Sequence, residues 1–166
     1  MQRNQCDKNV KIISAIDLRS NYILFVNLIT KVYNVTHSHC KDYPNYFNWY
    51  WTKVIPGVIN GTREILVCTF KDEIAGVAIL KSENNEQKLC TFLILGPFRV
   101  FHVTSLLLET AFEFLGTTKP LITISDTKID MFQGIIKKYN WEHTHTLEKG
   151  YYNNASQEIV FNGKIL

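Results

Sequence analysis

The pattern of apolar and polar positions divides the chain into short strands and a few helices. Apolar residues that alternate, or that run on over about four to eight positions, predict strands, whereas a spacing of three and four positions predicts helices. The expected strands cover residues 10–16, 64–70, 73–81, 88–95, 121–124, 141–147 and 157–161. The expected helices cover residues 20–33, 105–115 and 129–139, with a further short helix within 46–51. No internal repeat or linker interrupts this order, so one domain spanning residues 1–166 is expected.

The stretch from residue 88 to residue 115 carries the strongest chemical signal. A largely apolar strand at 88–95 leads through the turn Gly96–Thr104 into the amphipathic helix 105–115. The first N–H groups of a helix have no partner within the helix, and the helix dipole places partial positive charge at the same end. A strand that feeds such a helix start therefore predicts a site for an anion such as a phosphate group.

Composition narrows the class of protein. A chain of 166 residues with 46% hydrophobic and 20% charged residues is typical of a globular domain with a sizeable core. The formal net charge is only +3, so no general affinity for nucleic acid or for a membrane is expected. The four cysteines lack C-x-x-C spacing, residues 1–5 do not resemble a secretion signal, and no apolar run is long enough to span a membrane. We therefore expect a reduced, cytoplasmic protein.

The strand, turn and helix at 88–115 resemble the GNAT superfamily of acyl-CoA N-acyltransferases. In that superfamily an Arg/Gln-x-x-Gly-x-Gly/Ala turn holds the coenzyme A pyrophosphate. Here Arg99 takes the first position, His102 and Thr104 take the two glycine positions, and Ile94 matches the end of the central strand. Away from the turn, the resemblance rests on the order of elements and covers roughly the last two-thirds of the chain.

The resemblance implies a fold, an activity and a set of coenzyme-binding residues. The fold would be α/β (α+β), with a mixed, mostly antiparallel central sheet of about six to seven strands flanked by about four helices. The activity would be direct transfer of an acetyl group from acetyl-CoA to a primary amine, with no metal. In the family, backbone groups of the central strand hold the pantetheine arm, and one N–H polarises the thioester. The matching coenzyme-binding residues are Phe92, Leu93, Ile94, Arg99, Val100, Phe101, His102, Val103 and Thr104.

The turn departs from the family pattern at both glycine positions. Glycine tolerates positive φ and lets backbone amides approach a phosphate closely. His102 and Thr104 replace it here, and Val103 between them is β-branched and stiff. On one interpretation, the Thr104 hydroxyl and a protonated His102 supply the phosphate contacts. On the other, the loop no longer binds coenzyme A well.

The catalytic base and acid are not fixed by the resemblance. Lys88 stands near the position of the family's strand glutamate, and Glu86 is two residues away, in a stretch that also reads as a solvated turn. Ile136 stands at the position of the family's helical tyrosine. Tyr151 and Tyr152, before the last strand, either reach the cleft or lie at a surface edge. The candidate catalytic residues are therefore Tyr151, Tyr152 and Glu86.

Three further groups have both a chemical and a structural interpretation. Residues 37–40 (His-Ser-His-Cys) could join His143 and His145 around a metal, but adjacent ligands cannot close a site alone, so we expect a surface loop and no metal. Arg63 could grip a substrate carboxylate or form a surface pair with Glu64. The aromatic cluster could be a substrate wall or one edge of the core; it comprises Tyr43, Tyr46, Phe47, Trp49, Tyr50 and Trp51.

Two functions of different classes remain open. The first is an acetyl-CoA-dependent N-acetyltransferase acting on an amine of a small molecule or a protein. The second is a non-catalytic relative that keeps the fold as a protein-binding or regulatory module. The acceptor would be selected by loops at 34–62 and 148–156, and the protein could be a monomer or a homodimer.

Overall fold

The structure is a computed structural model and describes residues 9–40, 43–99 and 102–165. Val100 and Phe101, two of the expected coenzyme-binding residues, lie outside the described residues. The strands are β1 (Val10–Ser14), β2 (Arg63–Phe70), β3 (Glu73–Glu83), β4 (Glu86–Ile94), β5 (Ile122–Ser125), β6 (His143–Leu147) and β7 (Glu158–Phe161). The helices are α1 (Ala15–Leu18), α2 (Tyr22–His39), α3 (Tyr46–Trp49), α4 (Ile55–Asn60), α5 (Val103–Leu115) and α6 (Ile129–Tyr139), and a π-helical turn (Tyr50–Val54) joins α3 to α4.

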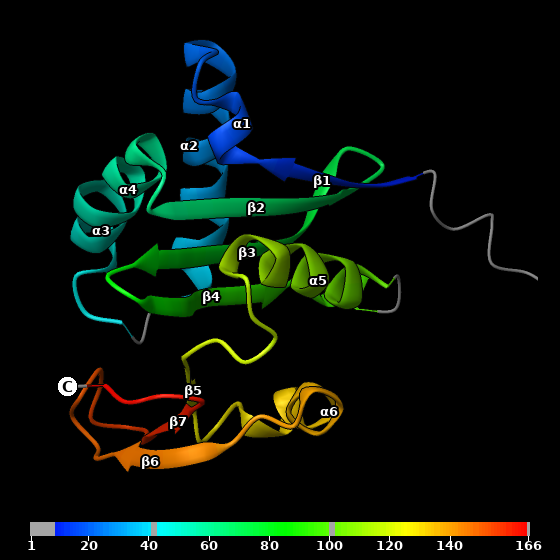
Figure 1. The fold of residues 1–166 in the computed structure, drawn as a ribbon. Coiled ribbons are helices and arrows are strands. Elements are labelled where there is room, and N and C mark those ends of the chain that lie inside the picture. The colour runs from blue at the N-terminus through cyan, green and yellow to red at the C-terminus, as the bar shows by residue number, and fades with distance from the viewer. Residues whose placement is uncertain (1–8, 41–42, 100–101, 166) are drawn as a thin grey trace, which may run out of the picture.

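The strands form two antiparallel sheets that meet at β4 and β5. The first sheet has the order β1-β2-β3-β4 and the second the order β5-β7-β6. Figure 1 shows the second sheet, with α6, below the first. The seven strands among the described residues agree with the expected six to seven, and the mixed, mostly antiparallel α+β fold class is confirmed.

The two sheets are joined by a short parallel contact at the beginning of β4 and β5. The Leu89 amide donates to the Leu121 carbonyl at 3.0 Å, and the Leu121 amide donates to the Gln87 carbonyl at 2.8 Å. Lys88 and Leu121 form the corresponding isolated parallel bridge. Beyond this point no strand pairing joins β4 to β5 among the described residues, so the two strands separate.

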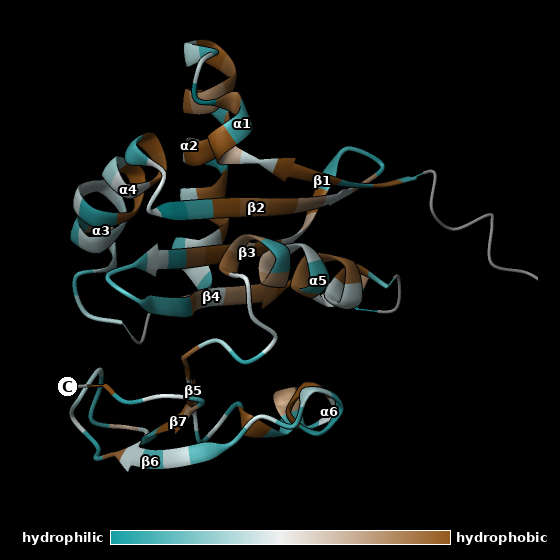
Figure 2. Ribbon diagram, in the orientation of Figure 1, coloured by the Kyte–Doolittle hydropathy of each residue, from teal (hydrophilic) through white to brown (hydrophobic). Residues whose placement is uncertain are grey.

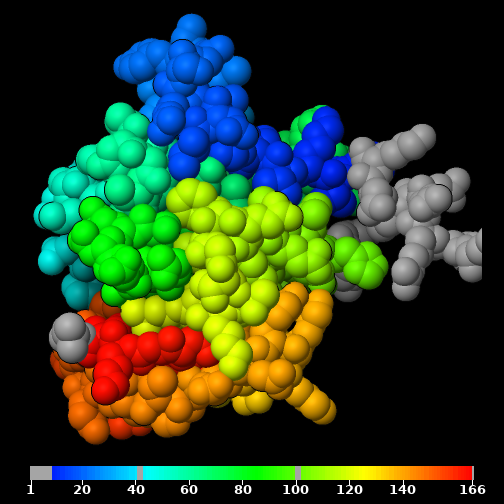
Figure 3. Space-filling view, viewed as in Figure 1, coloured from blue at the N-terminus to red at the C-terminus, as the bar shows by residue number. Residues whose placement is uncertain are grey.

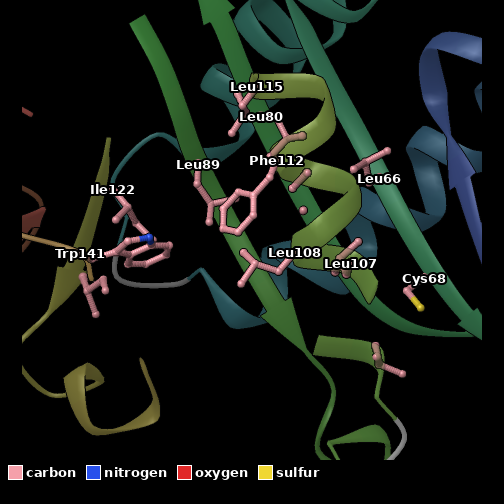
Figure 4. Close-up of a cluster of buried hydrophobic side chains, with 14 of the residues drawn as sticks. Leu66, Cys68, Leu80, Leu89, Leu107, Leu108, Phe112, Leu115, Ile122 and Trp141 are labelled. Carbon is pink, nitrogen blue, oxygen red and sulfur yellow. The ribbon is translucent and has the colours of Figure 1, made fainter. Parts of the chain in front are cut away.

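Helices cover both faces of the first sheet, because β2 and β3 carry apolar residues on both faces. On one face, α5 packs against residues such as Leu66 and Leu80 (Figure 4). On the other face, α2, α3 and α4 pack against residues such as Ile65 and Ile79. The apolar colouring of β2, β3 and the inner side of α5 in Figure 2 matches this arrangement, which is typical of strands buried on both faces.

The second sheet is tied to α5 through α6 and through the start of β6. Phe112 of α5 and Tyr139 of α6 form an edge-to-face pair with ring centroids 4.9 Å apart. The indole N–H of Trp141 donates to the Thr118 carbonyl at 2.8 Å, and Trp141 joins the α5 core together with Ile122 (Figure 4). In Figure 3 the orange C-terminal segment lies directly against the yellow-green one. These contacts hold the second sheet in place although so few hydrogen bonds join it to the first.

Most predicted elements are confirmed, but three regions are more helical than the periodicity indicates. The strand predicted over residues 10–16 ends at Ser14, whose side chain caps the helix α1 at residues 15–18. The helix predicted to end at residue 33 continues to His39, because Val32 and Thr36 remain buried and the Thr36 hydroxyl bonds the Val32 carbonyl at 2.8 Å. The loop expected at residues 37–40 is therefore wrong. Residues 46–60 form one continuous helical run rather than a single short helix. No helix among the described residues is long and apolar enough to cross a membrane.

Gly76 in β3 lies in tight contact with α5 and with the end of β4. An added Cβ would lie 2.8 Å from Ile94 Cδ1, 3.1 Å from the Leu93 carbonyl oxygen and 3.2 Å from Leu107 Cδ2. Two of these neighbours belong to β4 where it borders the separation from β5. Any side chain at Gly76 would therefore push the end of β4.

We predict that Gly76→Val lowers the free energy of unfolding by about 1–3 kcal/mol, the usual cost of overpacking a tight core. Gly134→Ala is the matched control, because a Cβ there meets nothing within 4 Å in the exposed middle of α6. That control should raise stability by up to about 1 kcal/mol through helix propensity. Urea unfolding measures both. Equal stability of Gly76→Val and the wild type would contradict the close approach.

Candidate active site

A cleft of about 600 Å³ opens where β4 and β5 separate. Its walls come from β4 on one side, from β5 on the other, and from α6. Phe92, Leu93 and Ile94, the three strand residues predicted to contact coenzyme A, all line it. Arg99 and Thr104 line it as well, so five of the predicted coenzyme residues meet in one cavity. The remaining lining residues include Ile122–Ser125, Lys128, Met131, Phe132 and Ile135.

The backbone of β4 presents hydrogen-bonding groups to this cleft. The Leu95 amide donates to the Ala75 carbonyl at 2.9 Å, so Leu95 and Ala75 form a hydrogen-bonded pair. Such pairs alternate along an antiparallel ladder, and Leu93 pairs with Val77 two residues earlier. Phe92 and Ile94 then direct their N–H and C=O groups away from β3, toward the cleft. These two residues, rather than Leu93, can bind an extended ligand through the backbone.

The turn between β4 and α5 places a helix start at one end of the cleft. A 3₁₀ turn (Gly96–Phe98) follows β4, and α5 begins at Val103, two residues before the predicted start. His102 precedes the helix with φ 53° and ψ 7°, a left-handed conformation that favours glycine. The first glycine position of the resembled motif therefore has the backbone that such a glycine would have, although histidine occupies it.

Positive charge lines the same cleft. Arg99 is exposed at the end of the 3₁₀ turn, and Lys128 precedes α6 on the opposite wall. The first N–H groups of α5, at Val103 and Thr104, belong to the helix start and so have no intrahelical acceptor. Together they can bind a diphosphate through two cations and a helix N-terminus. Sequence reasoning missed Lys128, because it lies in a connection far along the chain.

A smaller cavity of about 240 Å³ continues from the cleft on the side of α2 and α3. The two cavities share lining residues, namely Cys40, Tyr43, Cys90, Thr91 and Thr123. The smaller one is also lined by Tyr46, Trp49, Tyr152 and Pro44, and by the charged residues Arg63, Lys81, Glu86 and Lys88. An extended ligand in the cleft and a second molecule in the smaller cavity would therefore meet near Thr91.

The aromatic cluster is both core and cavity wall. Tyr50 is fully buried and donates a hydrogen bond to the Ile29 carbonyl at 2.7 Å, and burial raises its pKa. Tyr46, Trp49 and Tyr43 line the smaller cavity. Burial also raises the pKa of Tyr46, whose hydroxyl makes no well-aligned hydrogen bond among the described residues although Thr36, Cys40 and Thr91 are its polar neighbours. Tyr50 therefore belongs to the core, whereas Tyr43, Tyr46 and Trp49 form a wall of the smaller cavity.

The three candidate catalytic side chains lie in different surroundings. Tyr152 lines the smaller cavity, and burial, with a further contribution from Tyr151, raises its pKa to about 12. Tyr151 is 48% exposed and lies outside both cavities, and its ring centroid is 4.6 Å from that of Tyr152. Glu86 begins β4, lines the smaller cavity and pairs with Lys81 Nζ at 2.8 Å. Tyr152 and Glu86 thus line the same cavity, whereas Tyr151 lies outside it.

His39, which the sequence analysis assigned to a surface loop, lines the larger cleft from the last turn of α2. Its Nδ1 lies 2.9 Å from the Val35 carbonyl oxygen. A carbonyl can only accept a hydrogen bond, so in a neutral imidazole this contact favours the proton on Nδ1 and an acceptor at Nε2; Ser38 Oγ also lies 3.0 Å from Nδ1. Helical periodicity continues in the sequence to residue 39, and this pattern could have placed His39 on the helix. Among the described residues no group of three or more metal-ligating side chains occurs.

Comparison with known proteins identifies the fold. No protein-family model matches the chain, and no curated protein is significantly similar to it. Solved structures do match. A GNAT-family protein from Desulfovibrio desulfuricans has a TM-score of 0.65 at 14% identity, with 92% of this chain and 96% of that chain covered. Naa50 from Arabidopsis thaliana, in complex with the bisubstrate analogue CoA-Ac-MVNAL, has a TM-score of 0.62 at 15% identity, with 95% and 99% covered.

A Bacillus anthracis structure containing acetyl coenzyme A also matches, with a TM-score of 0.51 at 14% identity over 60% of this chain and 61% of that one. The agreement covers nearly the whole of this chain in the first two comparisons. The chain therefore has the fold of the GNAT acetyltransferases, as the resemblance at the turn implied.

We predict that His102→Gly is more stable than His102→Ala by about 1 kcal/mol. Both variants lose the imidazole, but only glycine relieves the left-handed backbone before α5. Chemical unfolding of the two variants side by side gives the difference. If alanine were as stable as glycine at this position, the left-handed conformation at His102 would be wrong.

Proposed function

We propose that the protein is an acetyl-CoA-dependent N-acetyltransferase that transfers the acetyl group directly to a primary amine. The observation that carries the proposal is the cleft between β4 and β5, which joins exposed strand backbone to a cationic helix start. The GNAT fold supports it, as does the presence of coenzyme A groups in two of the matching structures. The volume of about 600 Å³ is within the range of cofactor sites.

The coenzyme would lie along the cleft with its diphosphate at the start of α5. Arg99, Lys128 and the first N–H groups of α5 would bind the diphosphate. Phe92 and Ile94 would bind the pantetheine arm through backbone groups, and one of their N–H groups would polarise the thioester carbonyl. Thr104, with its hydroxyl at the first turn, would replace contacts that a glycine turn makes through bare backbone.

The acceptor amine would enter through the smaller cavity and attack the thioester carbonyl near Thr91. The new C–N bond forms as the C–S bond breaks, the amine gives up one proton, and the departing thiolate takes one up. Tyr152 would donate a proton to the thiolate, because a phenol whose pKa is about 12 remains protonated at neutral pH. His39, through Nε2, would accept the proton from the amine, because Glu86 lies five residues from Thr91 along β4 and pairs with Lys81.

We predict that the protein binds acetyl-CoA and that Arg99→Ala weakens binding about tenfold or more, since a charge-assisted phosphate contact contributes about 1.5–3 kcal/mol. Lys53→Ala, at an exposed position outside both cavities, is the control and should bind like the wild type. Calorimetric titration with acetyl-CoA and with coenzyme fragments lacking the diphosphate measures this. No binding at millimolar acetyl-CoA would contradict the proposal and favour the non-catalytic module.

We predict that Tyr152→Phe lowers kcat by about 10²-fold or more, the usual contribution of one positioned proton donor. Tyr151→Phe is the matched control, because it removes a neighbouring phenol that lies outside both cavities, and it should leave kcat within about twofold. His39→Gln in the same assay tests whether His39 accepts the proton from the amine. Release of the coenzyme thiol, followed with acetyl-CoA and an accepted amine, gives the rates. Equal effects of the two tyrosine variants would exclude Tyr152 as the acid.

A further inference from the structure

Three cationic side chains from three neighbouring strands lie side by side in a row and line the smaller cavity. Arg63 of β2 lies directly opposite Lys81 of β3, and Lys81 lies directly opposite Lys88 of β4. Residues opposite each other in an antiparallel sheet share a face, so the three side chains project to the same side. All three line the smaller cavity, beside the aromatic residues from α3.

This row carries more positive charge than the described residues neutralise. Lys81 pairs with Glu86 at 2.8 Å, and its side chain is only 23% exposed. Neither Arg63 nor Lys88 has a carboxylate within 4.0 Å among the described residues. The cavity therefore holds three positive charges and one negative charge on its described lining. Like charges placed directly opposite in a sheet destabilise it, so the row has a cost in folding that a bound anion would offset.

The Arg63 side chain can lie in this row because the residue packed against it is a glycine. Gly57 of α4 is buried, and an added Cβ would lie 2.5 Å from Arg63 Cδ and 2.7 Å from Cγ. The Arg63 stem thus lies flat against the α4 backbone. Its guanidinium reaches back over the sheet, where one nitrogen lies 3.8 Å from Cys90 Sγ. Gly57 is a positioning residue, because it acts through Arg63.

Two uncharged groups complete the cavity as a polar site. The Tyr46 hydroxyl is buried and makes no well-aligned hydrogen bond among the described residues, and Tyr46 is 6% exposed. Cys90 lies in the same wall, and burial raises the pKa of its thiol while the neighbouring cations Lys88, Arg63 and Lys81 act in the opposite direction. The thiol therefore adds no negative charge at neutral pH that could neutralise the row.

We propose that the acceptor is a small amine that also carries an anionic group, a carboxylate or a phosphate, which binds to Arg63, Lys81 and Lys88. This inference rests on the proposed acetyltransferase function, since it assigns the amine end to the reacting centre near Thr91. Lys88 and Thr91 are three residues apart on β4 but lie opposite Lys81 and Ile79, which are two residues apart on β3, so they are separated by about 7 Å along the sheet. The anionic group and the amine of the acceptor are therefore separated by several bonds. A cavity of about 240 Å³ fits a molecule of that size.

The test compares matched primary amines as acceptors with acetyl-CoA. An ω-amino carboxylate and an ω-aminoalkyl phosphate are each compared with a neutral alkylamine of equal chain length. The expected result is a kcat/KM at least tenfold higher for one or both anionic amines, and the better of the two identifies the anion. Equal kcat/KM for the neutral amine overturns the inference and leaves the acetyltransferase function standing.

Substitutions in the row of Arg63, Lys81 and Lys88 show whether these residues cause a preference for anionic amines. Lys88→Gln and Arg63→Gln should each raise KM for the anionic amine about tenfold and lower the ratio of kcat/KM between the anionic and the neutral amine by a similar factor. Gly57→Ala should raise KM in the same way although it removes no charge. Lys53→Gln, an exposed lysine outside the cavity, is the control for lost charge alone. A preference that survives Lys88→Gln and Arg63→Gln unchanged overturns the assignment to these residues.

A binding measurement separates failure of this inference from failure of the proposed function. Acetyl-CoA and the two anionic amines are titrated separately into the wild type and into Lys88→Gln. Binding of acetyl-CoA without Lys88-dependent binding of either anionic amine overturns the inference alone. Lys88-dependent binding of an anionic amine without binding of acetyl-CoA overturns the acetyltransferase function, and with it the role of that amine as an acceptor.

Discussion

The two hydrogen bonds that join β4 to β5 are the constraint on which the site depends. They tie Leu89 and Gln87 to Leu121 at the beginning of the two strands, and the strands then separate. The separation leaves the Phe92 and Ile94 backbone groups without a neighbouring strand, a state that normally costs free energy unless a ligand or water satisfies them. An open edge inside a sheet is thus stable only because α5 and α6 hold the two halves together through contacts such as that between Phe112 and Tyr139.

The helix start at α5 shows how the same backbone can be built with unusual residues. His102 adopts the left-handed conformation that glycine usually supplies, and histidine is among the residues that tolerate it best after glycine, asparagine and aspartate. The cost of that conformation is small beside the stabilisation from burying Val103, Leu107 and Leu108 in the core of the first sheet. A turn that lacks the family's glycines can therefore keep the position and direction of the helix N-terminus, which are what a phosphate group contacts.

The site is divided into two cavities because the two ends of β4 carry different residues. Toward its C-terminal end, β4 borders the cleft with apolar and backbone groups, and toward its N-terminal end it carries Lys88 beside Lys81 and Arg63. An apolar, backbone-lined channel suits a long flexible ligand, whereas a charged cavity suits a small polar one. In the proposed function, this contrast between the two ends of one strand would separate the binding of the donor from the selection of the acceptor.

The sequence by itself determined the local elements, such as the strand 88–95, the helix 129–139 and the buried helix after Arg99, whereas the mixed α+β fold class followed from the resemblance at the turn. Local periodicity and capping carry this information because they depend on residues within a few positions of each other. Only the tertiary structure decided that Arg63, Lys81 and Lys88 form one row, because strand register is set by pairing between distant segments. It also brought Tyr152, His39 and Lys128 to the cavities while leaving Tyr151 outside, since the packing of distant elements against one another, and not the neighbours in sequence, decides which side chains line a cavity.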